Sequence, residues 1–117
     1  MKPIDLVKSY YAAFDSHDFT KVRALLRNDF HFSGPMMEAH SPDELFAKMK
    51  DFDCDFKNHV LHMIDNGQTV GVLIDCVFSR PFQATIRMSE WFSVVDGKIA
   101  SSTLVYDTRQ MPAPAAA

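Results

Sequence analysis

The sequence predicts an α+β fold, in which helices come first and then cover a mainly antiparallel sheet. Apolar residues recur at helical spacing in the first half of the 117-residue chain and at a spacing of two from about residue 58 onward. Asn66-Gly67 and Asp96-Gly97 separate such alternating runs, and these dipeptides are the strongest short-range signals of a β-hairpin. Helices and strands segregated along the chain in this way are typical of α+β domains.

Two helices are predicted at the start of the chain. The first covers residues 4–14, where apolar side chains recur three and four residues apart and Pro3 suits the first turn. The second begins after Asp18, a residue type that caps helices well, and continues through Leu26. Residues 27–29 are expected to end it.

A short strand, a third helix and four long strands are predicted next. The strand covers residues 30–33, and the helix lies within residues 40–52, where Ser41 and Glu44 form a capping box around Pro42. The alternating pattern then predicts strands at residues 58–65, 69–79, 82–95 and 98–107. Consecutive hairpins between them imply an antiparallel meander.

Composition and charge narrow the class of protein. The chain is 47% hydrophobic and 23% charged, which suits one globular domain, expected over residues 1–110 with a disordered tail at 111–117. The net charge of −3 and the lack of a Lys/Arg cluster argue against a nucleic-acid partner, and no apolar run is long enough for a membrane partner. Without a signal-peptide pattern, a cytoplasmic protein with reduced Cys54 and Cys76 is expected. The seven methionines suit irregular core gaps or an adaptable pocket, and core filling is favoured.

Two stretches resemble the NTF2-like superfamily, the cone-shaped α+β fold of ketosteroid isomerases, scytalone dehydratase and the SnoaL-like polyketide cyclases. "YYAAFDSHDFTKVRALLRNDFHFSGP" (10–35) is similar to the family's aromatic helix, polar break, second helix and strand ending before a proline. "EWFSVVDGKIASSTLVYD" (90–107) is similar to its final hairpin. The resemblance implies the fold, but this fold hosts enzymes, binding modules and transport factors.

The resemblance also implies roles for particular residues. In ketosteroid isomerases, a tyrosine of the first helix and an acid of the penultimate strand form an oxyanion hole, and they match Tyr10 and Glu90. SnoaL-like cyclases place an acid/base carboxylate near the end of the last strand, where Asp107 lies. The isomerases' general base precedes the proline that ends the first strand. That position is Gly34 here, and glycine cannot accept a proton from a substrate carbon.

The alternation of residues 88–94 separately predicts that Glu90 faces the interior. If Phe92 points inward, Met88 and Glu90 do so too, whereas Trp91 points to the outer face. A carboxyl group among apolar side chains has a raised pKa and can act as a general acid or base near neutral pH. The alternative is a solvated Glu90, or one paired with Arg87 or with Lys48.

Two functions remain open from the sequence. The first is a cofactor-independent isomerase, cyclase or dehydratase for a small hydrophobic molecule, with Tyr10, Glu90 and Asp107 as catalytic residues. The five histidines show no ligand spacing, so no metal is expected. The second function is a non-catalytic ligand-binding or dimerisation module, which Gly34 favours. The predicted substrate-binding residues are Phe14, Phe32, Met36, His40, Met88, Phe92 and Tyr106. A homodimer is expected through the outer sheet face that carries Trp91.

Overall fold

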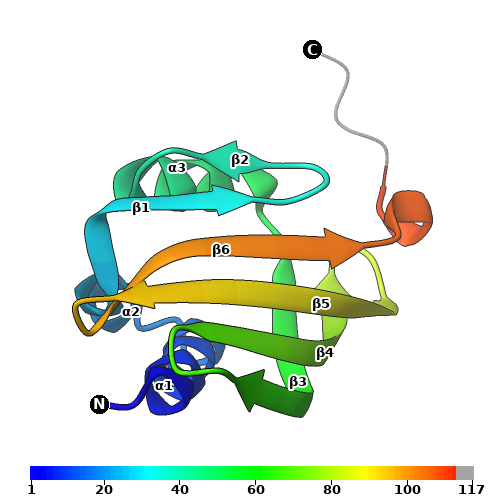
Figure 1. The fold of residues 1–117 in the computed structure, drawn as a ribbon. Coiled ribbons are helices and arrows are strands. Elements are labelled where there is room, and N and C mark those ends of the chain that lie inside the picture. The colour runs from blue at the N-terminus through cyan, green and yellow to red at the C-terminus, as the bar shows by residue number, and fades with distance from the viewer. Residues whose placement is uncertain (113–117) are drawn as a thin grey trace.

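Three helices cover one face of a six-stranded sheet (Figure 1). The computed structural model describes residues 1–112 of the chain. The elements are, in order, α1 (Pro3–Asp15), α2 (Phe19–Leu25), β1 (Leu26–Ser33), β2 (Glu38–Ala39), α3 (Pro42–Phe52), β3 (Asp55–Asp65), β4 (Thr69–Arg80), β5 (Ala84–Val95), β6 (Lys98–Tyr106) and the short 3₁₀ helix η1 (Thr108–Gln110).

The local signals that begin the helices operate as predicted. The Asp18 carboxylate accepts a hydrogen bond from the Lys21 backbone N–H, and the Ser41 hydroxyl accepts one from the Glu44 N–H. The predicted end of α2 was wrong, because the chain is already extended at Leu26 and β1 begins there. Residues 27–29, expected to end the helix, therefore lie in the strand.

The predicted antiparallel meander is confirmed. The strand order across the sheet is β2-β1-β6-β5-β4-β3, so β3 to β6 pair with their neighbours in sequence. At the β5–β6 turn, Asp96 and Gly97 both have positive φ, as a two-residue type I′ hairpin requires. The sequence did not predict that β1 pairs in parallel with β6, nor the short β2.

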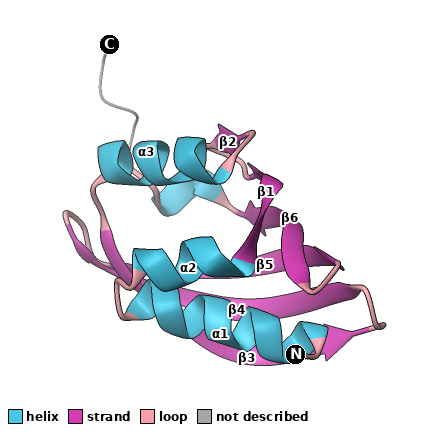
Figure 2. Cartoon of the chain, turned by 90° about the vertical axis from the view of Figure 1, so that its left-hand side faces the viewer, coloured by secondary structure: helices cyan, strands magenta, loops and turns pink. Residues whose placement is uncertain are grey.

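The helices and the curved sheet enclose the core. Figure 2 shows α1 and α2 side by side on one face of the sheet, with α3 set apart beside β1 and β2. Side chains of the inner sheet face, such as Val70, Ile74, Ile86 and Phe92, are fully or almost fully buried beneath the helices. The chain thus has the cone-shaped α+β fold that its sequence predicts. Side chains of α1 and α3 line a cavity between the helices and the sheet.

The outer face of the sheet is covered by no other element of the described chain. Trp91 is 45% exposed there, and its ring lies over Gly71 of the neighbouring strand, so closely that a Cβ at Gly71 would meet it at 2.6 Å. Ile64 and Val105 are exposed on the same face. The predicted alternation is therefore confirmed, with Trp91 outside and its neighbours Glu90 and Phe92 inside.

The end of the chain departs from the expected tail. Met111 follows η1 and is buried against the core, although the tail was expected to begin at this residue. Residues 113–117 of the predicted tail lie outside the described residues. None of the helices within residues 1–112 combines the length and apolar character that crossing a membrane requires.

Candidate functional site

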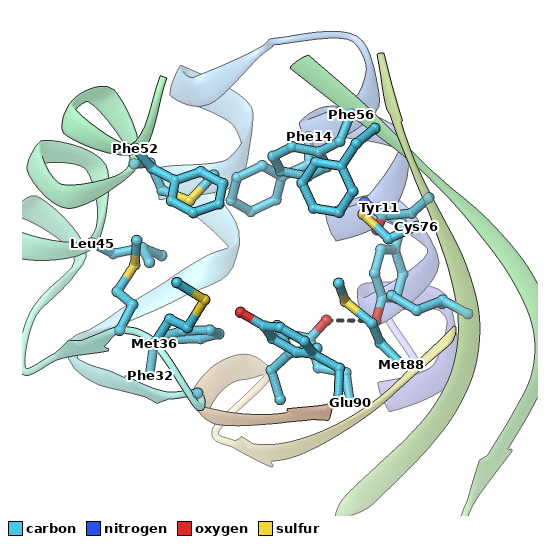
Figure 3. A pocket seen from close by; sticks show the side chains of 18 of the residues that line it. Tyr11, Phe14, Phe32, Met36, Leu45, Phe52, Phe56, Cys76, Met88 and Glu90 are labelled. Carbon is cyan, nitrogen blue, oxygen red and sulfur yellow. Dashed lines mark hydrogen bonds between the residues drawn. The ribbon is translucent and has the colours of Figure 1, made fainter. Parts of the chain in front are cut away.

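A cavity of about 110 Å³ lies between the inner sheet face and the helices. In the close view of Figure 3, Glu90 and Met88 lie on one wall, Leu45 and Met36 lie on the opposite wall, and Phe14, Phe52 and Phe56 border a third. The cavity is lined by Tyr10, Tyr11, Phe14, Phe32, Gly34, Met36, Met37, Leu45, Met49, Phe52, Phe56, Asn58, Ile74, Cys76, Phe78, Met88, Glu90, Leu104, Tyr106 and Met111.

Glu90 is the one acidic residue among these described lining residues, and it is 5% exposed. The Tyr11 hydroxyl donates a hydrogen bond of 2.7 Å to its Oε1 atom, and the Ser102 hydroxyl donates one of 2.5 Å to Oε2. Burial raises the pKa of Glu90 by desolvation, and the two hydroxyl donors lower it by a smaller amount. The net direction is upward, so the pKa of Glu90 lies above its ordinary value.

The alternative partners suggested for Glu90 are engaged elsewhere. Arg87 points to the outer face and pairs with Asp75 at 2.9 Å, and Lys48 pairs with Glu44 on α3 at 3.0 Å. Because strand β5 alternates, an ion pair between Arg87 and Glu90 would need one of them to point to the wrong face. Glu90 is therefore held by hydroxyl groups and not by a cation.

Tyr11, and not Tyr10, supplies the hydroxyl that contacts Glu90. The prediction of Tyr10 was wrong on this contact, since consecutive helical residues point about 100° apart and Tyr10 is rotated toward the aromatic core. Its ring packs edge-on against Phe14 at 4.8 Å and against Phe92 at 5.2 Å between ring centroids. Tyr10 still lines the cavity, and burial raises the pKa of both tyrosines.

Several predicted substrate-binding residues do line the cavity. The structure places Phe14, Phe32, Met36, Met88 and Tyr106 there. Phe92 is fully buried beneath the cavity, packed against Tyr10 and Tyr11, and does not line it. His40 is exposed in the bend that follows the buried Ala39 at the end of β2, and it does not line the cavity.

Asp107 lies outside the cavity and acts as a local cap. Its carboxylate accepts hydrogen bonds from the backbone N–H of Arg109 at 2.9 Å and from the Arg109 Nε at 2.7 Å. These contacts with Arg109 lower the pKa of Asp107. The prediction that Asp107 serves the site is therefore not supported by its position, which is that of a turn residue at the start of η1.

Gly34 lines the cavity at the position where the isomerases carry their base. A Cβ at Gly34 would lie 3.1 Å from the Phe32 ring, so a larger side chain would have to displace that ring. The Phe32 ring would have to shift by a few tenths of an ångström to accept any side chain at position 34. The cavity has one acid where a two-carboxylate mechanism would need a second.

Among the contributors that sequence reasoning missed, four stand out. Ser102 and Tyr11 hold Glu90, Met111 closes part of the wall, and Asn58 lines the cavity while its side-chain amide donates to Asp15. The alternation of β6, which places Ser102 on the same face as the predicted Tyr106, was a usable signal for Ser102. No comparable local pattern indicated Met111.

Five of the seven methionines line the cavity, and four of these five also belong to the core or pack against it, so the core filling that the sequence favoured and the pocket lining occur together. The five lining methionines are Met36, Met37, Met49, Met88 and Met111. Met36 is 38% exposed, whereas Met88 is buried beside Glu90. Flexible thioether side chains can adjust the shape of this wall around different occupants.

Within residues 1–112, no group of three or more His, Cys, Asp or Glu side chains is arranged to hold a metal ion. Cys54 and Cys76 are free thiols, and burial raises the pKa of Cys76 to about 12. What the cavity offers is an apolar lining with one acid, whose pKa is raised, and phenolic hydroxyls. Such groups can donate hydrogen bonds to an oxygen atom or exchange a proton with it.

Comparison with known proteins supports the fold. No curated protein matches the chain. An NTF2-like protein of unknown function from Cytophaga hutchinsonii is 26% identical, with a TM-score of 0.79 over 90% of this chain and 89% of the other. An NTF2-like protein of unknown function from Burkholderia pseudomallei is 20% identical, with a TM-score of 0.81 over 92% of both chains.

A third similar structure is an LEH-like epoxide hydrolase from M. tuberculosis, which is 18% identical, with a TM-score of 0.81 over 92% of this chain and 84% of the other. At this identity the likeness concerns the fold alone. The model of the SnoaL-like domain matches residues 7–102, most of the chain. Together with the cone-shaped fold, this match shows that the chain belongs to the SnoaL-like family of NTF2-like proteins.

Proposed function

We propose that the chain binds a small, mainly apolar molecule in the cavity and exchanges a proton with an oxygen of that molecule through Glu90. The observation that carries the proposal is a buried carboxyl group on the wall of an otherwise apolar cavity, held by Tyr11 and Ser102. A glutamate with only a structural role would not stabilise the fold by lining a cavity, because burying its carboxyl group without a cation costs folding free energy.

The chemistry follows from the protonation state of Glu90. Since its pKa is raised, the acid is available as a proton donor to a carbonyl, hydroxyl or epoxide oxygen. Once the proton has left, Tyr11 and Ser102 stabilise the carboxylate by their hydrogen bonds. The same carboxylate can then recover a proton from the substrate or from water, which suits isomerisation, dehydration, cyclisation or hydrolysis without a cofactor.

The fold relatives include an enzyme that moves protons to and from oxygen. The similar structure from M. tuberculosis is named an epoxide hydrolase, and opening an epoxide with water needs such a proton transfer. This likeness is compatible with a hydrolase or isomerase among the reactions proposed for Glu90.

A non-catalytic binding module is the second candidate, and Gly34 favours it. The lining residues that the structure describes contain no second carboxylate that could serve as a separate base. In this case Glu90 would orient an oxygen of the bound molecule by a hydrogen bond and would not catalyse a reaction of that molecule.

The experiment that separates the two functions is a substrate screen followed by Glu90→Gln. A thermal-shift screen with cyclic ketones, lactones and epoxides identifies ligands, and the ligands are then tested for turnover. The enzyme function predicts that Glu90→Gln lowers kcat by about 10²–10⁴-fold, the usual contribution of general acid–base catalysis. Gln keeps the hydrogen-bonding shape but cannot release a proton at neutral pH.

The matched control is Asp107→Asn, which changes an acid of the same chain outside the cavity. Its turnover should stay within about two-fold of the parent protein. Full activity of Glu90→Gln with an unchanged Tm would disprove the catalytic assignment. Ligand binding without turnover in the parent protein would support the binding module.

We also propose that two copies of the chain pair through the outer sheet face. In the register of the sheet, Ile64 and Trp91 lie on either side of Gly71, and Val105 lies one strand further along the same face. These side chains are 64%, 45% and 56% exposed, respectively. An exposed apolar group of this kind, to which Val77 on the same face adds, is typical of an interaction surface.

A further inference from the structure

The charge of the cavity lining restricts its occupant, and this step rests on the proposed binding function. The lining residues within the described chain include no Lys, Arg or His. They include one acid, Glu90, whose two oxygens already accept hydrogen bonds from Tyr11 and Ser102. A carboxylate or phosphate in the cavity would therefore find no cation to pair with and would lie close to an acid.

The cost of placing an anion there is large. Moving an ionised group from water into apolar surroundings without a partner costs many kcal/mol in principle, and proteins avoid it by neutralising the group. The walls around Glu90 are made of aromatic rings, methionines and aliphatic side chains, as Figure 3 shows for Met88, Phe14 and Leu45. Anionic ligands are thus disfavoured whatever their shape.

A cationic ligand is disfavoured for a different reason. An amine would have to pair with ionised Glu90, but this carboxyl group is 5% exposed and both of its oxygens already accept hydrogen bonds from Tyr11 and Ser102, and desolvation disfavours its ionised form. The two hydroxyl donors offset this effect only in part, because desolvation is the larger of the opposing contributions. Binding an ammonium group would therefore require both charges to be buried in the same cavity, a cost that their attraction repays only with excellent geometry.

The size of the cavity limits the number of rings that a ligand inside it can have. Its volume is about 110 Å³, and an engineered apolar cavity of about 150 Å³ in another protein accepts benzene. Pockets for drug-sized ligands measure about 300–1,000 Å³. A single six-membered ring fits this range once the methionine side chains adjust, whereas a fused multi-ring molecule would have to extend beyond the cavity.

We infer that the cavity selects an uncharged molecule with a single ring and one oxygen substituent, whose oxygen meets Glu90 and Tyr11. Carboxylates and amines of the same size are excluded. The class includes cyclic ketones, simple phenols and cyclic epoxides. The oxygen strengthens binding because it can form a hydrogen bond with Glu90 or Tyr11, and the ring fills the rest of the cavity, which is lined by aromatic rings and methionines.

The methionines provide the readout for a test. Protein labelled with ¹³C at the methionine methyl groups gives seven signals, and five of these residues line the cavity. Met1 and Met63 do not line it and serve as internal controls. Four probes of nearly equal size are titrated at pH 7: p-cresol, toluene, p-toluate and 4-methylbenzylamine. They differ in having a neutral oxygen, no oxygen, a negative charge and a positive charge.

The expected result is a defined order of affinity. p-Cresol shifts the cavity methyl signals and saturates, with Met1 and Met63 unmoved. Toluene shifts the same signals and binds a few-fold more weakly, which is the usual net effect of losing one hydrogen bond. p-Toluate and 4-methylbenzylamine bind at least about 100-fold more weakly than p-cresol, because each carries an unpaired charge into the cavity.

Different failures have different meanings. If p-toluate or 4-methylbenzylamine shifts the cavity signals with an affinity within ten-fold of p-cresol, the uncharged class is wrong while the binding function stands. If toluene binds as well as p-cresol, the inferred preference for a ligand with an oxygen substituent is wrong. If none of the probes moves any cavity methyl signal up to its solubility, the proposed ligand-binding function itself is wrong.

Two variants localise the oxygen contact. Tyr11→Phe should remove most of the preference for p-cresol over toluene, and Glu90→Leu provides the same test at the other contact, should Tyr11→Phe fold poorly. If both variants fold and both keep the preference for p-cresol over toluene, the ligand oxygen does not contact Glu90 and Tyr11. Lys8→Gln is the control, because Lys8 is exposed on α1 and changes the net charge without touching the cavity. It should leave all four affinities unchanged.

Discussion

Glu90 and Asp75 lie on neighbouring strands of one sheet, but on opposite faces. Asp75 lies on the outer face beside Arg87, which donates hydrogen bonds of 2.9 and 3.0 Å to its two oxygens. Glu90 lies on the inner face and receives its hydrogen bonds from the hydroxyls of Tyr11 and Ser102. The guanidinium group lowers the pKa of Asp75, whereas desolvation raises the pKa of Glu90.

The difference teaches that the face of the strand decides the chemistry of a carboxyl group here. On the outer face, water and a cation keep the acid ionised, and such exposed pairs contribute little to stability. On the inner face, hydroxyl partners hold the acid without supplying a compensating charge, so the neutral form is favoured. The inner group is therefore the one suited to proton exchange.

The largest effect expected from substitutions on the two faces of the sheet is on the free energy of unfolding. Phe92→Ala on the inner face should lower the free energy of unfolding by about 3–5 kcal/mol, since the ring is fully buried against Tyr10 and Tyr11. Trp91→Ala, one residue earlier on the outer face, should cost clearly less when measured on the monomer. Urea unfolding followed by circular dichroism measures both variants. Equal losses would mean that the two faces are equally buried in solution.

The next effect concerns the outer face. Trp91→Asp should weaken the proposed pairing of two copies by at least about 100-fold, because it places a charge at the centre of the apolar group. Sedimentation velocity over a concentration series measures the dissociation constant, and Ser89→Thr on the same strand is the matched control. A parent protein that remains monomeric at the highest concentration would rule out the pairing.

A smaller effect, of defined sign, is expected in the pH dependence of stability. The raised pKa of Glu90 means that the folded chain binds a proton more tightly than the unfolded chain does. The stabilisation from the neutral acid is present at low pH and is lost as the pH rises from the ordinary value of 4.5 through the raised pKa. Glu90→Gln should remove this loss, so the parent and the variant should diverge with rising pH. Parallel curves would contradict the raised pKa.

The smallest effect is expected for Asp75→Asn, and its sign is opposite. The lowered pKa of Asp75 gives a stabilisation that is present above the ordinary pKa of aspartic acid and is lost as the pH falls through the lowered one. The pair with Arg87 is exposed and screened by salt, so the change should shrink further at high ionic strength. A Tm series at low and high salt checks this, and a salt-independent effect would argue for a buried pair.

Much of this arrangement could be predicted from local patterns. The period of two fixed which residues of β5 face inward, and two dipeptide turns fixed the meander, so Glu90 could be found without a structure. The choice between Tyr10 and Tyr11 could not, because an error of one residue rotates a helical side chain by about 100°. The resemblance indicated one tyrosine, and the packing of α1 on the sheet decided for the other.

Other features depend on contacts between distant parts of the chain. The parallel pairing of β1 with β6 has no local signal, since strand pairing partners are set by the whole topology. Met111 carries no periodicity that would distinguish a wall of the cavity from a frayed end. His40 was expected near the site because of its position close to Met36 in the sequence, and Asp107 because of the resemblance to SnoaL-like cyclases, but His40 is exposed after the end of β2 and Asp107 caps η1.

The methionine-lined wall makes the cavity sensitive to oxidation. Peroxide converts a thioether into a sulfoxide, which is polar and accepts hydrogen bonds strongly. Met36 is 38% exposed and is the most accessible of the five cavity methionines. Met88 is 5% exposed and lies beside Glu90. Oxidation would therefore reach the mouth of the cavity first and would turn an apolar entrance into a polar one before the inner acid is affected.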